Sequence, residues 1–154
     1  WLQINTLLVT LGQNICKAKS KCENCPIEKY FNEAKIFKPD VLVCSLSANI
    51  PSDDFEQDIF VPNLAKFINY LSDDNKNTKV IISSSFFGNE NKNKAIEEYA
   101  KINSASYVYI SDIAKNKENL AMNLFKHRGI QIHPGDKGMK ILSERYLKEI
   151  YRFI

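Results

Sequence analysis

The sequence has few glycines and no long apolar run, and these two shortages exclude several classes of function. The chain of 154 residues holds 5 glycines. None of them falls in the spacing of a dinucleotide-binding turn or of a phosphate-binding P-loop. The longest apolar runs, such as 41–46 and 80–82, are far shorter than the ~20 residues that a membrane-spanning helix needs. The sequence therefore predicts neither a cofactor nor a segment that crosses a bilayer.

Charge of one sign is also missing. The chain carries 21 Lys and Arg residues against 18 Asp and Glu residues, a formal net charge of +3, and these charges are scattered. A scattered charge favours no polyanionic partner, so nucleic acid is not expected to bind. The hydrophobic fraction of 44% is typical of an ordinary folded domain. We therefore expect residues 1–154 to form a single domain.

The four cysteines do not form a metal-binding pattern. Cys16, Cys22 and Cys25 cluster in a polar, Lys-rich stretch, but a zinc site would need a second pair of ligands nearby, and none follows. A disulfide within the cluster and free thiols remain equally open, and no metal is expected. Cys44 lies within an apolar run, where a thiol is most simply a small buried hydrophobic side chain.

The pattern of apolar residues predicts strands that alternate with helices. Apolar residues at helical spacing predict helices, and continuous apolar runs bounded by turn residues predict strands covered on both faces. Pro62 suggests that the third helix starts there or is kinked. This order is typical of an α/β fold, and we expect a three-layer α/β/α sandwich around a parallel sheet. The predicted helices are 2–15, 27–37, 55–71, 94–102 and 137–153, and the predicted strands are 40–46, 78–84 and 106–110.

Two predicted helices precede the first strand, which is unusual for such a sheet. In doubly wound folds the first strand is usually central, and later strands add outward from it. Either the sheet has only three or four strands, or the chain begins after its first central strand. We favour the second alternative, and so expect a domain that is incomplete at its N-terminal side.

Polar side chains follow each predicted strand. They lie in 45–49, in 83–88 and in the pair Ser111 and Asp112, and the segment 129–139 precedes the last helix. Ligands of open parallel sheets bind beyond the carboxyl ends of the strands, where these segments converge. Hydroxyls, an amide, a carboxylate and an imidazole at one edge suit acyl-transfer chemistry.

Two of these blocks resemble a known family. The run from Pro39 to Val43 that leads into Asn49, followed by the block from His133 to Met139, resembles the SGNH (GDSL-like) hydrolase superfamily of lipases and esterases. The block around His133 is similar to the end of one bacterial branch of that superfamily. The resemblance implies a flavodoxin-like sheet and a site made of a serine nucleophile, a glycine and an asparagine of the oxyanion hole, and a histidine base.

The resemblance assigns roles to two residues. His133 would be the base that takes the proton of the attacking serine, and Asn49 would donate its amide N–H to the oxyanion. The implied substrates are acyl esters, acetyl esters among them, of carbohydrates or small molecules, and the implied location is extracytoplasmic. The simpler interpretations are that His133 caps a helix or bonds within a loop, and that Asn49 is a turn residue.

The sequence also departs from the family pattern. The family has Asp three residues before the histidine, where this chain has Ile130, which cannot accept the imidazole N–H or stabilise its positive charge. The orienting acid would then be Asp112 or Asp136. Ser47 and Ala48 replace the residues that usually precede the asparagine.

The nucleophile block itself is missing. No Gly-Asp-Ser or similar block occurs, and Ser45, Ser47 and the serines 83–85 lack the strand-turn-helix context of a nucleophile. Strand-end hydroxyls usually satisfy local backbone groups instead. We therefore expect the serine upstream of Trp1. The alternatives are a catalytically degraded binding or structural module of the same fold, and a flavodoxin-like receiver or nucleotide module.

Overall fold

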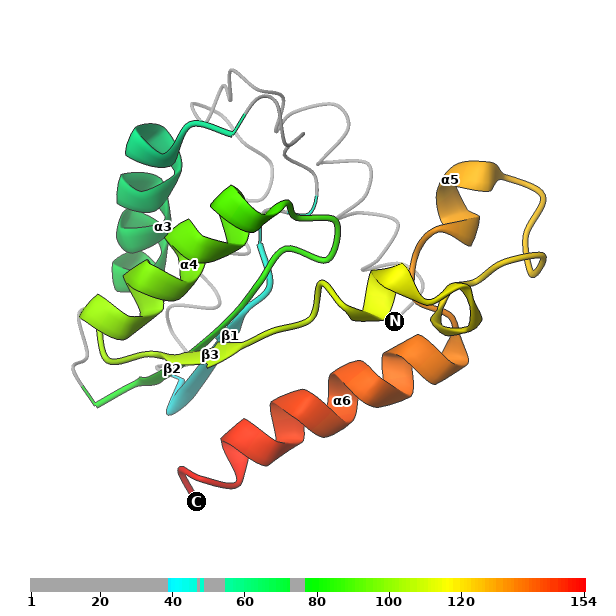
Figure 1. The fold of residues 1–154 in the computed structure, drawn as a ribbon. Helices are drawn as coiled ribbons and strands as arrows, with labels where there is room; N and C mark the ends of the chain where they lie inside the picture. Colours follow the sequence, from blue (N-terminus) through cyan, green and yellow to red (C-terminus); the bar gives the residue numbers. More distant parts are fainter. Residues whose placement is uncertain (1–38, 47, 49–54, 73–76) are drawn as a thin grey trace, which may run out of the picture.

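The structure, a computed structural model, describes residues 39–46, 48, 55–72 and 77–154 (Figure 1). The helices predicted over 2–15 and 27–37 lie outside these residues, as does the cluster of three cysteines.

The described residues form a mixed α/β fold. Three strands lie in the order β1-β2-β3, and both neighbouring pairs run parallel. A helix connects each strand to the next, so the predicted parallel α/β organisation is confirmed. The elements are β1 (Val41–Cys44), α3 (Gln57–Ser72), β2 (Lys79–Ser83), α4 (Glu90–Ile102), β3 (Ser106–Val108), η2 (Ile113–Lys115), η3 (Lys117–Asn119), α5 (Arg128–Gln131) and α6 (Asp136–Ile150).

Two helix starts differ from the sequence prediction, because local backbone bonding decides where a helix starts. Helix α4 begins four residues before the predicted start, since the side chain of Asn89 accepts a hydrogen bond from the Lys92 N–H at 2.9 Å and caps it. Helix α3 contains Pro62 instead of starting at it. In the second turn a proline removes only one helical hydrogen bond, and the helix continues.

All three predicted strands, and the predicted last helix, extend beyond the observed elements. Strand β3 ends at Val108, because the Ile110 N–H donates to the Ser84 side chain at 2.8 Å instead of continuing the ladder. Helix α6 ends at Ile150, three residues before the predicted end, and a turn follows it.

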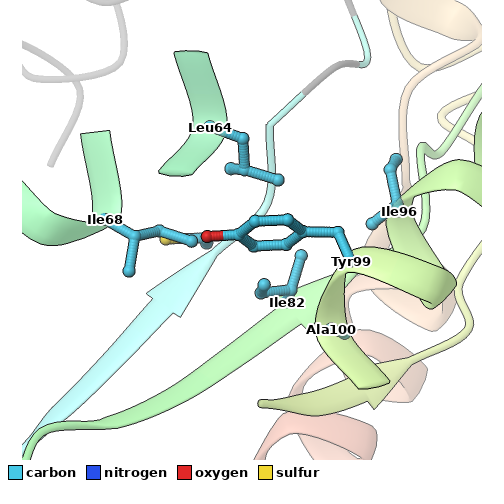
Figure 2. Packing of buried hydrophobic residues seen from close by; sticks show 7 residues of the cluster. Leu64, Ile68, Ile82, Ile96, Tyr99 and Ala100 are labelled. Atoms are coloured by element: carbon cyan, nitrogen blue, oxygen red, sulfur yellow. The ribbon is translucent and has the colours of Figure 1, made fainter. Parts of the chain in front are cut away.

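One face of the sheet is covered by α3 and α4. Cys44 and Ile82 point to this face from the strands, and the Tyr99 ring extends from α4 between the two helices toward Ile68 (Figure 2). Cys44 is 3% exposed, as predicted, and burial raises the pKa of its thiol to about 11. The thiol is therefore a neutral core group at physiological pH. The remaining buried members are Leu64, Ile96 and Ala100.

The opposite face of the sheet is covered by α6 (Figure 1). Ile81 and Val108 point to this face, where Leu142 and Tyr146 of α6 pack against their cluster. Strand β2 is therefore buried on both faces, as predicted. For β1 this prediction is wrong in part: Val43 is 41% exposed, because α6 contacts β3 at the far side of the sheet.

Candidate functional site

The carboxyl ends of the three strands meet at one edge, as the sequence predicts. The hydroxyl of Ser83, at the end of β2, lies 3.0 Å from that of Ser45, just after β1. The hydroxyl oxygen of Ser84 accepts the N–H groups of Ile110 and Ser111, just after β3, at 2.8 Å and 3.1 Å. The sheet register therefore brings the three polar segments together.

Part of this edge is a closed network of hydrogen bonds. Asn93 of α4 donates from Nδ2 to the Ser111 hydroxyl at 2.7 Å, and its Oδ1 accepts the Ser85 N–H at 3.0 Å. The Ser111 hydroxyl also bonds to the Ser85 carbonyl. All of these side chains, with Ser84, are buried. The hydroxyls hold backbone groups in place, which is the structural role expected of strand-end serines.

Gly88 allows this network to close. A Cβ at this position would lie 2.4 Å from Asn93 Oδ1 and 2.7 Å from the Ser85 Cβ. Any side chain would therefore displace the amide that joins α4 to the loop after β2. The close approach explains the glycine at the end of the segment 83–88.

His133 lies beside this network, in the turn between α5 and α6. Its N–H donates to the Ile130 carbonyl at 3.1 Å, and its carbonyl accepts the Ala121 N–H at 2.8 Å. The side chain is exposed, and its ring lies edge-to-face against Phe87, with the ring centroids 5.5 Å apart. To the described residues the imidazole makes no hydrogen bond that would occupy its nitrogens.

The two glycines that follow His133 hold the block against η3. A Cβ at Gly135 would lie 2.8 Å from the Leu120 carbonyl oxygen, and one at Gly138 would lie 2.2 Å from that of Asn119. The Gly135 N–H donates to the same Asn119 carbonyl at 2.9 Å. Both glycines thus allow a close backbone approach that fixes the position of His133.

Asp112, one of the two predicted orienting acids, is held by a cation. Arg145 of α6 binds its carboxylate in a bidentate ion pair, with N–O distances of 2.6 Å and 2.7 Å. Hydrogen bonds from Arg145 hold the pKa of this carboxyl below its ordinary value. Arg145 also donates to the Tyr109 carbonyl at 2.5 Å. The pair therefore ties α6 to the end of β3.

Asp136, the other predicted acid, is the first residue of α6 and is exposed. A carboxylate at this position interacts favourably with the positive end of the helix. Among the described residues neither Asp112 nor Asp136 forms a hydrogen bond with His133. Ile130 holds the His133 backbone through its carbonyl, but its side chain is apolar and 45% exposed.

Asn49 lies outside the described residues, so its predicted approach to His133 stays a prediction. Ser47 lies outside them as well. In the part of the chain that is described, no group of three or more His, Cys, Asp or Glu side chains could hold a metal ion. No helix there has the length and the apolar character needed to cross a membrane.

A cleft of about 540 Å³ lies beside the end of β3 and shares Gly88 with the closed network. Burial, together with the nearby Glu97 carboxylate, raises the pKa of Tyr107 in its wall to about 12. The Tyr107 phenol therefore stays protonated and lies 3.4 Å from the Asn93 carbonyl, to which it donates. This tyrosine joins β3 to α4.

Three residues of this edge were not predicted from the sequence in the roles that they have. Asn93 and Arg145 each bind a partner 18 or more positions away along the chain, and nothing local marks such pairs. The third residue is Phe87, whose contact with His133 joins two loops. Phe86 is buried at 7% exposure, but Phe87 is only partly buried and contacts His133.

Comparison with family models, with curated proteins and with solved structures finds no match for this chain.

Proposed function

We propose that the chain belongs to an ester hydrolase of the SGNH type, which cleaves acyl esters, acetyl esters included, of carbohydrates or small molecules. The observation that carries the proposal is His133 itself. It is exposed at the carboxyl edge of a parallel sheet, its backbone is fixed on both sides, and no described residue occupies its nitrogens. Ligands of parallel α/β proteins bind at this edge.

The proposed reaction is acyl transfer through a serine. The serine oxygen attacks the ester carbonyl carbon while His133 takes the hydroxyl proton, and the same proton then goes to the departing alcohol. In the second step His133 takes a proton from water as the water oxygen attacks the acyl carbon, and it returns this proton to the serine oxygen as the bond between that oxygen and the acyl carbon breaks and the acid leaves. Asn49 would donate to the oxyanion that forms in each step.

The proposal includes a three-layer, flavodoxin-like sandwich. Helices α3 and α4 on one face of the sheet, and α6 on the other, support three layers. The serines 83–85 are buried, and the Ser84 hydroxyl already binds two backbone N–H groups, so the proposal places the nucleophile at another serine. Activity is therefore measured on the full-length protein with any residues that precede Trp1.

The experiment measures hydrolysis of p-nitrophenyl acetate and release of acetate from acetylated saccharides. We expect His133→Ala to lower kcat/KM by about 10³-fold or more, as loss of a catalytic base does in serine hydrolases. His127→Ala is the matched control, because among the described residues the His127 side chain accepts the Gly129 N–H at the start of α5 and has no role in the proposed reaction. Equal rates for the wild type and His133→Ala would overturn the proposal.

One observation favours the alternative of a binding or structural module. Ile130 replaces the orienting acid, and Asp112 is already bound by Arg145. A wild-type protein that is folded but hydrolyses no ester in these assays would support that alternative.

A further inference from the structure

The His133 imidazole has an aromatic neighbour, Phe87, in a chain that has Ile130 at the sequence position of the resembled family's carboxylate. Its ring and that of Phe87 lie 5.5 Å apart at an interplanar angle of 77°. Aromatic rings prefer such edge-to-face arrangements at centroid separations of about 4.5–7 Å. The His133 backbone is held by two hydrogen bonds, and the ring contact favours the observed orientation of its side chain.

Phe87 is itself held from both sides. Its ring lies edge-to-face against Phe86, at 4.9 Å and 85°, and Phe86 belongs to the buried cluster beneath α6. On the chain before these rings, Ser84 and Ser85 take part in the closed network. After them, Gly88 lies against the Asn93 amide. A row of three rings therefore runs from the core to the imidazole at the surface.

We propose that Phe87 is a positioning residue for His133, and that its ring performs the orienting task for which the chain lacks an acid at Ile130. This inference rests on the proposed function, because orientation matters only if the imidazole transfers protons. The aromatic ring restricts the rotamer of His133 and leaves both nitrogens free of a fixed hydrogen-bond partner among the described residues. The closed network thus serves the site indirectly, since it holds the loop that carries Phe87.

The contact is tested by NMR on the full-length protein. The ring signals of His127 and His133 are assigned from spectra of variants in which one of the two histidines is replaced. We expect nuclear Overhauser effects between the ring protons of Phe87 and His133 in the wild type. In Phe87→Leu, the His133 ring signals should move toward those of a solvent-exposed histidine. His127 should stay unchanged, because Phe87 is not its partner. The absence of the ring-to-ring effect in the wild type would overturn the inference without any reference to activity.

The positioning role is tested by kinetics with the same proteins. We expect Phe87→Leu to lower kcat by about 10- to 100-fold with KM nearly unchanged, since a displaced catalytic group affects the chemical step. Phe87→Tyr keeps the ring and should keep most of the activity. Phe125→Leu removes an exposed aromatic ring from the segment before His133 and should have no effect.

The two assays separate the two proposals. If the wild-type protein shows the contact between Phe87 and His133 but has no esterase activity, the proposed function is overturned and the contact itself is confirmed. If the wild type is active and Phe87→Leu has the same kcat, the positioning role is overturned and the proposed function is unaffected.

Discussion

The carboxyl edge of the sheet has two halves that use polar side chains in opposite ways. In the closed half, Ser84, Ser85, Asn93 and Ser111 are buried, and they hydrogen-bond to one another and to backbone groups. In the open half, His133 is exposed, and only its backbone and one ring face are held.

This difference shows which polar groups at the edge are available for chemistry. A buried hydroxyl that already holds two backbone N–H groups cannot approach a substrate without breaking those bonds, and leaving buried groups unpaired costs free energy. An exposed imidazole with available nitrogens can exchange protons at no such cost. We therefore assign stability to the closed half and proton transfer to the open half. Substitutions in one half test its role without altering the other.

The largest expected effect concerns the partner proposed for His133 in the open half. Asn49→Ala in the full-length protein should lower kcat by about 10²- to 10³-fold, the usual loss when one oxyanion donor is removed. Its thermal unfolding temperature should stay the same, because the proposed role of this amide is to bind the oxyanion and not to stabilise the fold. An unchanged rate at unchanged stability would remove Asn49 from the site.

In the closed half we expect substitutions to lower the stability of the fold. Asn93→Ala leaves the Ser85 N–H without its partner in a buried position, so the free energy of unfolding should fall by about 2–3 kcal/mol. Urea denaturation followed by circular dichroism measures this loss. Asn91→Ala, at an exposed position of the same helix, is the control and should change stability by less than about 0.5 kcal/mol. Equal stability of the two variants would show that the network is not structural.

A smaller effect is expected at the ion pair between the two halves. Arg145 lowers the pKa of Asp112, so the pair stabilises the fold above the ordinary carboxyl pKa of 3.8 and loses this contribution as the pH falls through the lower folded-state value. Because Asp112 is partly exposed, Asp112→Asn should cost about 0.5–1 kcal/mol at pH 7. The difference from the wild type should shrink in acid and at high salt.

The control for the ion pair is Asp136→Asn, at the exposed start of α6, which should cost at most about 0.5 kcal/mol. Both variants should hydrolyse esters at the wild-type rate. If Asp112→Asn slowed hydrolysis while Asp136→Asn did not, the result would support Asp112 as the acid that orients His133.

The strand and helix order was predictable because it depends on local patterns. Runs such as 78–84 show burial directly in their composition, and the parallel order of the strands brings Ser45 and Ser83 together at one edge. Helix boundaries were less predictable: the cap at Asn89 depends on a single hydrogen bond that apolar spacing does not report, and α3 continues through Pro62, which the sequence marked as a start or a kink.

The details of the site were predictable only where chemistry is local. His133 could be found from its own block, and Cys44 from its apolar neighbours. The binding of Asp112 by Arg145 joins residues 33 positions apart, and the ring contact between Phe87 and His133 joins two loops. Such contacts follow from packing, and the sequence pattern therefore left two acids as candidates where the structure engages one of them elsewhere.

The most direct test of the two-halves account is labelling of the full-length protein with a serine-reactive fluorophosphonate, followed by mass spectrometry. The account predicts one labelled serine outside 83–85 and 111, labelling that is lost on unfolding, and a rate that collapses in His133→Ala but not in His127→Ala. No label on the folded wild type, a label on Ser84, Ser85 or Ser111, or undiminished labelling of His133→Ala would contradict it.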